Sequence, residues 1–152
     1  MIWIRNRQKP TLLNIKKIRR VVQRILTSLG LHEVEISLLL VDDKQIRELN
    51  RRFLCRDKPT NVLAFSMKEG EFSALHPHLL GDLVISIETA KRQSRQSGLN
   101  EMEMITLLLI HGILHLLGYE HEGRKKEARE MAIKQKELFQ MIIGKQKNKC
   151  KM

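Results

Sequence analysis

The chain has 152 residues, of which 42% are hydrophobic, so its length and composition indicate one folded domain and exclude a wholly disordered chain. Lys and Arg number 28 against 17 Asp and Glu. The resulting net charge of +11 favours a polyanionic partner such as RNA, DNA or an anionic membrane; a basic protein with no such partner is the alternative. The two cysteines exclude a disulfide scaffold, and the apolar stretches are too short for a signal peptide or for the roughly 20 residues of a membrane span. We expect a soluble, cytoplasmic protein that does not enter a membrane.

The first 30 residues predict a short strand followed by an amphipathic helix. Met1 to Ile4 forms the strand, and Thr11 is expected to cap a helix that Gly30 ends. The apolar residues of this helix recur at helical spacing: Leu12, Ile15, Ile18, Val22, Ile25, Leu26 and Leu29. Its other face is basic, which indicates either ordinary solvated surface or an RNA contact: Lys16, Lys17, Arg19, Arg20 and Arg24.

A second strand, a second helix and a third strand follow. Glu33 to Val41 is dense in aliphatic residues, as strands are, and Asp42 or Asp43 can cap the next helix. The charged segment Leu54 to Thr60 is expected to be a loop, because its proline disfavours helix at the residue before it. Asn61 to Ser66 then forms the third strand.

The remaining chain predicts a fourth strand and three helices after an irregular loop at Lys68 to Leu80. Gly81 to Ile87 forms the strand and Glu88 to Ser97 a short helix. A last helix is expected from about Lys125 to Ile143, followed by a basic, frayed tail at residues 145–152.

The helix between these two is apolar on nearly all sides, so it should be central and buried. Asn100 and Glu103 form a capping-box-like start, and Gly118 ends it. Strands mixed with helices, and too few strands for a doubly wound sheet, predict the α+β class. We expect a single domain over residues 1–144, with a mixed sheet of about four strands covered by helices.

Three of the six histidines fall within the sequence HGILHLLGYEH, residues 111–121. His111 and His115 are four residues apart, which places them on one face of a helix. His121 would turn away on a continuing helix, but Gly118 allows the chain to fold back. Three neutral imidazoles then form an open site suited to Zn²⁺, with the fourth position free. The alternative is that they are ordinary histidines at a helix end.

The residue after the first histidine is informative. The spacing of the histidines matches that of the metzincin peptidases, which carry a glutamate at that position as general base. This chain has Gly112 there, which moves no proton, so a peptidase of that mechanism is disfavoured. Glu120, beside His121, is a candidate to serve a bound water, although a solvated carboxylate is the alternative.

The sequence HGILHLLGYEH resembles the signature of the YbeY family of bacterial endoribonucleases and ribosomal RNA maturation factors. Two further stretches resemble that family in the same order: DKPTNVLAF, residues 57–65, and GDLVIS, residues 81–86. The resemblance implies a zincin-like metal helix with one zinc ion held by His111, His115 and His121. It also implies cleavage of single-stranded RNA, processing of the 3′ end of the small-subunit ribosomal RNA, and a role in ribosome quality control. Its partners would be a ribosomal RNA precursor and the small ribosomal subunit.

The chain departs from the family pattern at three positions. Glu120 stands where the family has aspartate, Ala64 where it has serine, and Leu54 where it has an arginine expected to act at the RNA phosphate. Leucine does not bind phosphate.

Two cations close to Leu54 are candidates for the phosphate role. We hypothesise that Arg56 takes it, since a guanidinium binds phosphate oxygens bidentately and stabilises transition-state charge. The alternative is that Arg56 pairs with Asp57 or faces water, and that Lys58 supplies the cation.

A different class of function also fits the sequence. A non-catalytic ribosome assembly factor would bind ribosomal RNA or a ribosomal protein and use the metal only to hold the helix end. Loss of RNA cleavage with retention of RNA binding in a histidine variant distinguishes the enzyme from the assembly factor.

Overall fold

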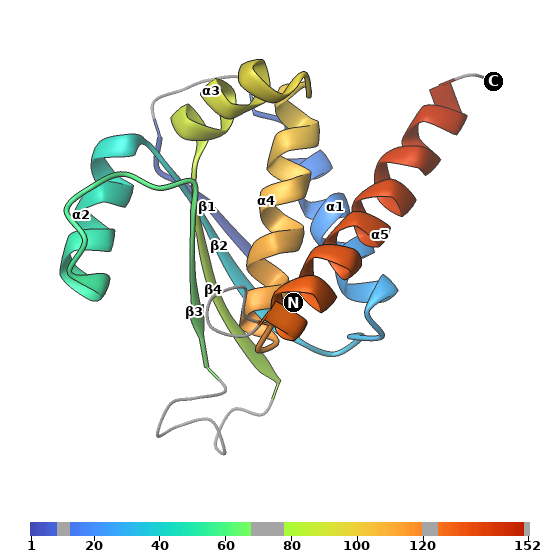
Figure 1. Cartoon of the computed structure of the whole chain (residues 1–152), viewed down its shortest axis with the longest axis horizontal. Coiled ribbons are helices and arrows are strands. Elements are labelled where there is room, and N and C mark those ends of the chain that lie inside the picture. Colours follow the sequence, from blue (N-terminus) through green and yellow to red (C-terminus); the bar gives the residue numbers. More distant parts are fainter. Residues whose placement is uncertain (9–12, 68–77, 120–124, 151–152) are drawn as a thin grey trace.

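A four-stranded mixed sheet lies at the centre of the computed structural model, which describes residues 1–8, 13–67, 78–119 and 125–150, with side chains as far as residue 144 (Figure 1). Its strands are β1 (Ile2–Asn6), β2 (Glu35–Val41), β3 (Val62–Ser66) and β4 (Leu79–Ser86). They lie in the order β1-β2-β4-β3; β1, β2 and β4 are parallel, and β3 is antiparallel to β4. The predicted α+β class and four-stranded mixed sheet are confirmed.

Helices cover both faces of this sheet. They are α1 (Ile15–Ser28), α2 (Asp43–Leu54), α3 (Ile87–Ser97), α4 (Glu101–Leu116) and α5 (Lys125–Cys150). Alternation along β4 separates the two faces: Leu83 and Ile85 pack in the main core, whereas Val84 packs with Ile46 of α2. Accordingly, α1, α4 and α5 lie on one side of the sheet and α2 on the other (Figure 1).

The start of α1 differs from the prediction. Its N-cap is Asn14, whose side-chain oxygen accepts a hydrogen bond from the backbone N–H of Lys17 at 3.1 Å. The prediction that Thr11 caps this helix was therefore wrong, and Thr11 itself lies outside the described residues. Asparagine satisfies an otherwise unpaired N–H of the first turn as well as threonine does, so both are strong capping residues in the sequence.

Three other helix ends lie at the capping residues that the sequence predicts. Asp42 caps α2 in a capping box with Gln45, and Asn100 does the same for α4 with Glu103. Gly98 ends α3 with a positive φ of 73°. Each of these ends depends on residues within four positions of one another, and for this reason the sequence predicts them well.

Among the described helices, α4 is the most buried. Ten of its sixteen residues are buried, and it packs on α3, α5, β3 and β4. Because neighbouring elements surround α4, its residues are apolar on nearly all sides. Its two histidines lie near its C-terminal end.

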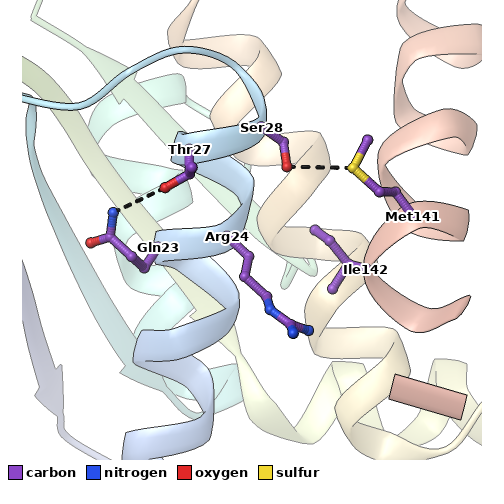
Figure 2. A pocket seen from close by; sticks show the side chains of 6 residues that line it. All are labelled: Gln23, Arg24, Thr27, Ser28, Met141 and Ile142. Carbon is purple, nitrogen blue, oxygen red and sulfur yellow. Dashed lines mark hydrogen bonds between the residues drawn. The ribbon is translucent and has the colours of Figure 1, made fainter. Parts of the chain in front are cut away.

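The last helix is longer than the sequence predicts. Its backbone continues to Cys150 instead of ending near Ile143. It packs across α1, where Ser28 donates a hydrogen bond to the sulfur of Met141 at 3.6 Å beside a cavity of about 180 Å³ (Figure 2). The basic side chains in its last turns carry no apolar pattern, so hydrophobic periodicity gives no sign of this extension.

None of the described helices is by itself long and apolar enough to cross a membrane. Together α3 and α4 meet the same criterion of length and composition, but their axes are bent by 111°.

Candidate metal centre

The helix α4 brings two of the predicted ligands together. The Nε2 atoms of His111 and His115 lie 3.1 Å apart, and their rings meet edge to face with centroids 4.6 Å apart. Both histidines are half-buried. The spacing of four residues thus produces the convergence of two ring nitrogens that the sequence predicts.

A third side chain fixes the orientation of the first imidazole. Gln135 of α5 places its Oε1 atom 2.8 Å from Nδ1 of His111. An amide oxygen only accepts hydrogen bonds, so Nδ1 carries the ring proton and Nε2 presents its lone pair. This arrangement is typical of metal-binding histidines, whose second nitrogen donates to a neighbouring acceptor.

The pair fits a zinc ion. Zinc binds imidazole nitrogen at roughly 2.0–2.1 Å in tetrahedral geometry, which places two such nitrogens roughly 3.3 Å apart. The observed 3.1 Å is close to that separation. His121 and Glu120 lie outside the described residues. Among the residues that are described, no group of three His, Cys, Asp or Glu side chains is arranged to hold a metal.

The chain turns sharply directly after the histidine pair. Gly118 has a φ of 99°, its N–H donates to the carbonyl of His115, and the N–H of Tyr119 donates to the carbonyl of Leu114, both at 3.0 Å. These two bonds define a Schellman motif, in which a left-handed residue ends the helix. The predicted end of the helix at Gly118 is confirmed.

The packing of α4 explains why glycine follows the first histidine. A Cβ atom at position 112 would lie 2.7 Å from a methyl of Leu83 and 3.3 Å from one of Val62. Position 112 therefore faces the sheet rather than the imidazole pair. A glutamate there would have neither room nor access to a metal ion, which is a further argument against a peptidase of the metzincin type.

The two cations predicted to contact phosphate lie in the segment that joins α2 to β3. Arg56 and Lys58 are both exposed, and in the described part of the chain their side chains form no hydrogen bond or ion pair. Asp57 pairs with Arg47 at 2.9 Å, and this hydrogen bond holds the pKa of Asp57 below its usual value. The pairing of Arg56 with Asp57, one of the predicted alternatives, is therefore absent.

The backbone of this segment is anchored to α2. The side chain of Asn50 donates to the carbonyl of Lys58 at 2.9 Å, and the backbone N–H of Arg56 donates to the carbonyl of Asn50 at 3.3 Å. The segment then runs back past α2 to the start of β3 (Figure 1). Neither predicted cation lines the cavity that opens beside His111.

Sequence reasoning missed Gln135. The inward stripe of α5 contains the buried residues Met131, Leu138 and Ile142, and Gln135 falls on that stripe at helical spacing. A polar side chain at an otherwise apolar inward position is a recognisable signal for a buried polar contact, although it does not identify the partner.

Comparison with known proteins places the chain in a family. Residues 3–143 match the family model described as Endoribonuclease YbeY. Two relatives named Endoribonuclease YbeY are similar over most of their length. The one from Syntrophotalea carbinolica is 48% identical over 93% of this chain and 95% of its own. The one from Syntrophus aciditrophicus is 46% identical over 94% of this chain and 90% of its own.

A solved structure supports the same relationship. The solution structure of TM1509 from Thermotoga maritima superposes with a TM-score of 0.67 and 25% sequence identity, covering 98% of this chain and 93% of that one. The histidine motif, the fold that presents it and these similarities agree. The chain belongs to the YbeY family of endoribonucleases.

Proposed function

We propose that this protein is a zinc-dependent endoribonuclease that cleaves single-stranded RNA. Its task would be maturation of the 3′ end of small-subunit ribosomal RNA and ribosome quality control, with a ribosomal RNA precursor in the small subunit as substrate. The names of its relatives support RNA cleavage. The observation that carries the metal requirement is the 3.1 Å approach of two imidazole nitrogens, one oriented by Gln135.

The proposal assigns a role to each predicted residue. His111, His115 and His121 would hold the ion, with one coordination position left for substrate or water. A bound zinc ion would supply Lewis acidity to a phosphodiester group or a water molecule. Arg56 and Lys58 would hold phosphate oxygens, and Glu120 would accept a proton near the ion.

The composition of the chain supports an RNA substrate held mainly by its phosphates. The net charge is +11, and aromatic residues, which stack on bases, are only 4% of the chain. The guanidinium of Arg56 is exposed and has no partner among the described residues, which is compatible with such a contact.

Metal analysis combined with a cleavage assay tests the proposal. Purified protein should contain about one zinc ion per chain, and it should cut precursor small-subunit RNA until a chelator is added. Zinc should restore cleavage to the chelated protein. Cleavage that is unchanged by complete metal removal would contradict the proposal.

The contact between Gln135 and His111 gives a second prediction. Gln135→Leu preserves side-chain volume but removes the acceptor for Nδ1–H, so the ring loses its fixed orientation. We expect zinc affinity to fall roughly 10–100-fold, measured by competition with a chromophoric chelator. Gln140→Leu is the matched control, because Gln140 is exposed on the same helix. Equal affinities of the two variants would show that the hydrogen bond does not support metal binding.

A further inference from the structure

A cavity of about 370 Å³ opens beside His111, where α3, α4 and α5 meet the start of β3. This volume lies within the roughly 300–1,000 Å³ of small-molecule sites. Met104, Leu107 and Leu108 of α4 supply apolar walls. Four amide side chains supply most of the polar groups: Asn61, Gln93, Gln96 and Gln135. None of the described residues that line it is an Asp, Glu, Lys or Arg.

A chain of hydrogen bonds fixes the orientation of two of these amides. The backbone N–H of Val62 donates to Oδ1 of Asn61 at 2.7 Å, so the NH₂ group of Asn61 is the one that donates to Oε1 of Gln93 at 3.1 Å. The NH₂ group of Gln93 is left over, and it has no hydrogen-bond partner within the described chain.

Gln135 is oriented in the same way from the other side. Its Oε1 accepts from Nδ1 of His111, which leaves its NH₂ group without a partner among the described residues. The cavity thus combines apolar walls with amide N–H donors that the protein itself does not satisfy. Such donors favour a ligand with hydrogen-bond acceptors.

We propose that this cavity binds one nucleobase of the RNA strand, next to the phosphate held at the histidine centre. The inference rests on the proposed function and adds a base subsite to it. A nucleobase is flat and uncharged, has apolar faces, and carries carbonyl oxygens and ring nitrogens along its edge. Proteins recognise single-stranded RNA by enclosing such unstacked bases and bonding to their edges. A phosphate or sugar phosphate would instead require a cationic lining, which the described lining residues lack.

The two sites share one side chain. Gln135 contacts His111 through its oxygen, and its NH₂ group is available to a base in the cavity. A base bound there would place its adjoining phosphate toward the imidazole pair, so base binding would position the strand for cleavage.

Cleavage of abasic RNAs by the full chain tests the subsite. At one position beside the cut bond, loss of the base should slow cleavage by up to about tenfold, the effect of one lost hydrogen bond. In Gln93→Leu the same loss should slow cleavage less, because one of the two amide donors to the base is already absent, whereas in Gln140→Leu the full effect should remain. An equal effect of base removal in the unchanged protein and in Gln93→Leu would overturn the proposal.

Binding of nucleosides to the unchanged protein separates this proposal from the proposed function. Uridine, cytidine, adenosine and guanosine are titrated while the side-chain amide NMR signals of Gln93 and Gln135 are followed. At least one nucleoside should shift both signals, and ribose 5-phosphate should shift neither. If no nucleoside shifts them, or if only N-acetyl amino acid amides do, the subsite is wrong even though RNA is cleaved. If nucleosides bind but no RNA is cleaved, the subsite stands and the proposed function fails.

Discussion

Replacement of His115 by alanine is expected to abolish zinc binding and RNA cleavage while leaving the fold intact. The imidazole supplies one of two nitrogens that lie 3.1 Å apart, so its loss removes a ligand rather than a supporting contact. We therefore expect zinc affinity to fall by more than the roughly 10–100-fold typical of losing a supporting partner. The helix should persist, because alanine is the best helix former and the side chain is only half-buried.

Three measurements on this variant distinguish an enzyme from an assembly factor. Zinc content, cleavage of precursor RNA and binding of the same RNA are compared with those of His32→Ala, which replaces an exposed histidine outside the motif. Lost cleavage with retained RNA binding supports the enzyme. Full growth of cells that depend on His115→Ala would instead favour a non-catalytic factor, and unchanged cleavage in vitro would remove the histidine centre from the mechanism.

The convergence of His111 and His115 and the end of their helix follow from local features of the sequence. His111 and His115 are separated by one helical turn, and Gly118 ends the helix three residues later. Periodicity and capping carry such information within a window of a few residues. For the same reason the four strands and five helices are found in their predicted order.

Contacts between distant segments are what the sequence does not reveal. Gln135 lies 24 residues from His111 and approaches it only because α5 packs on α4. The pairing of Asp57 with Arg47 depends likewise on how the segment after α2 folds back along that helix. Apolar patterns show that such faces are buried, but they do not show which partner covers them.

Gly112 combines a local signal that the sequence reveals with a tertiary contact that it does not. Its position after the first histidine is a local signal, and from it the sequence excludes a glutamate base. Its closeness to Leu83 is a tertiary fact, and only the structure shows that the glycine is required by packing against the sheet.

Substitution of Gly112 by glutamate is therefore expected to unfold most of the protein rather than create a peptidase. The new Cβ would lie 2.7 Å from Leu83, and the carboxylate would be forced into the core between α4 and the sheet. Overpacking costs about 1–3 kcal/mol, and an unpaired buried charge costs several kcal/mol more. Their sum is comparable with the about 5–15 kcal/mol that stabilises a typical domain. Urea unfolding followed by circular dichroism measures the loss.

Two alanine variants show whether packing is the cause. Gly112→Ala adds only the clashing Cβ, so its cost of about 1–3 kcal/mol is partly offset by the roughly 1 kcal/mol by which alanine favours helix over glycine. Gly144→Ala carries the same helix preference with nothing within 4 Å of its Cβ, so it should raise the free energy of unfolding. Opposite signs at these two helical glycines would establish that the sheet lies against position 112. A stable Gly112→Glu variant that hydrolyses peptides would contradict this packing and restore the peptidase interpretation.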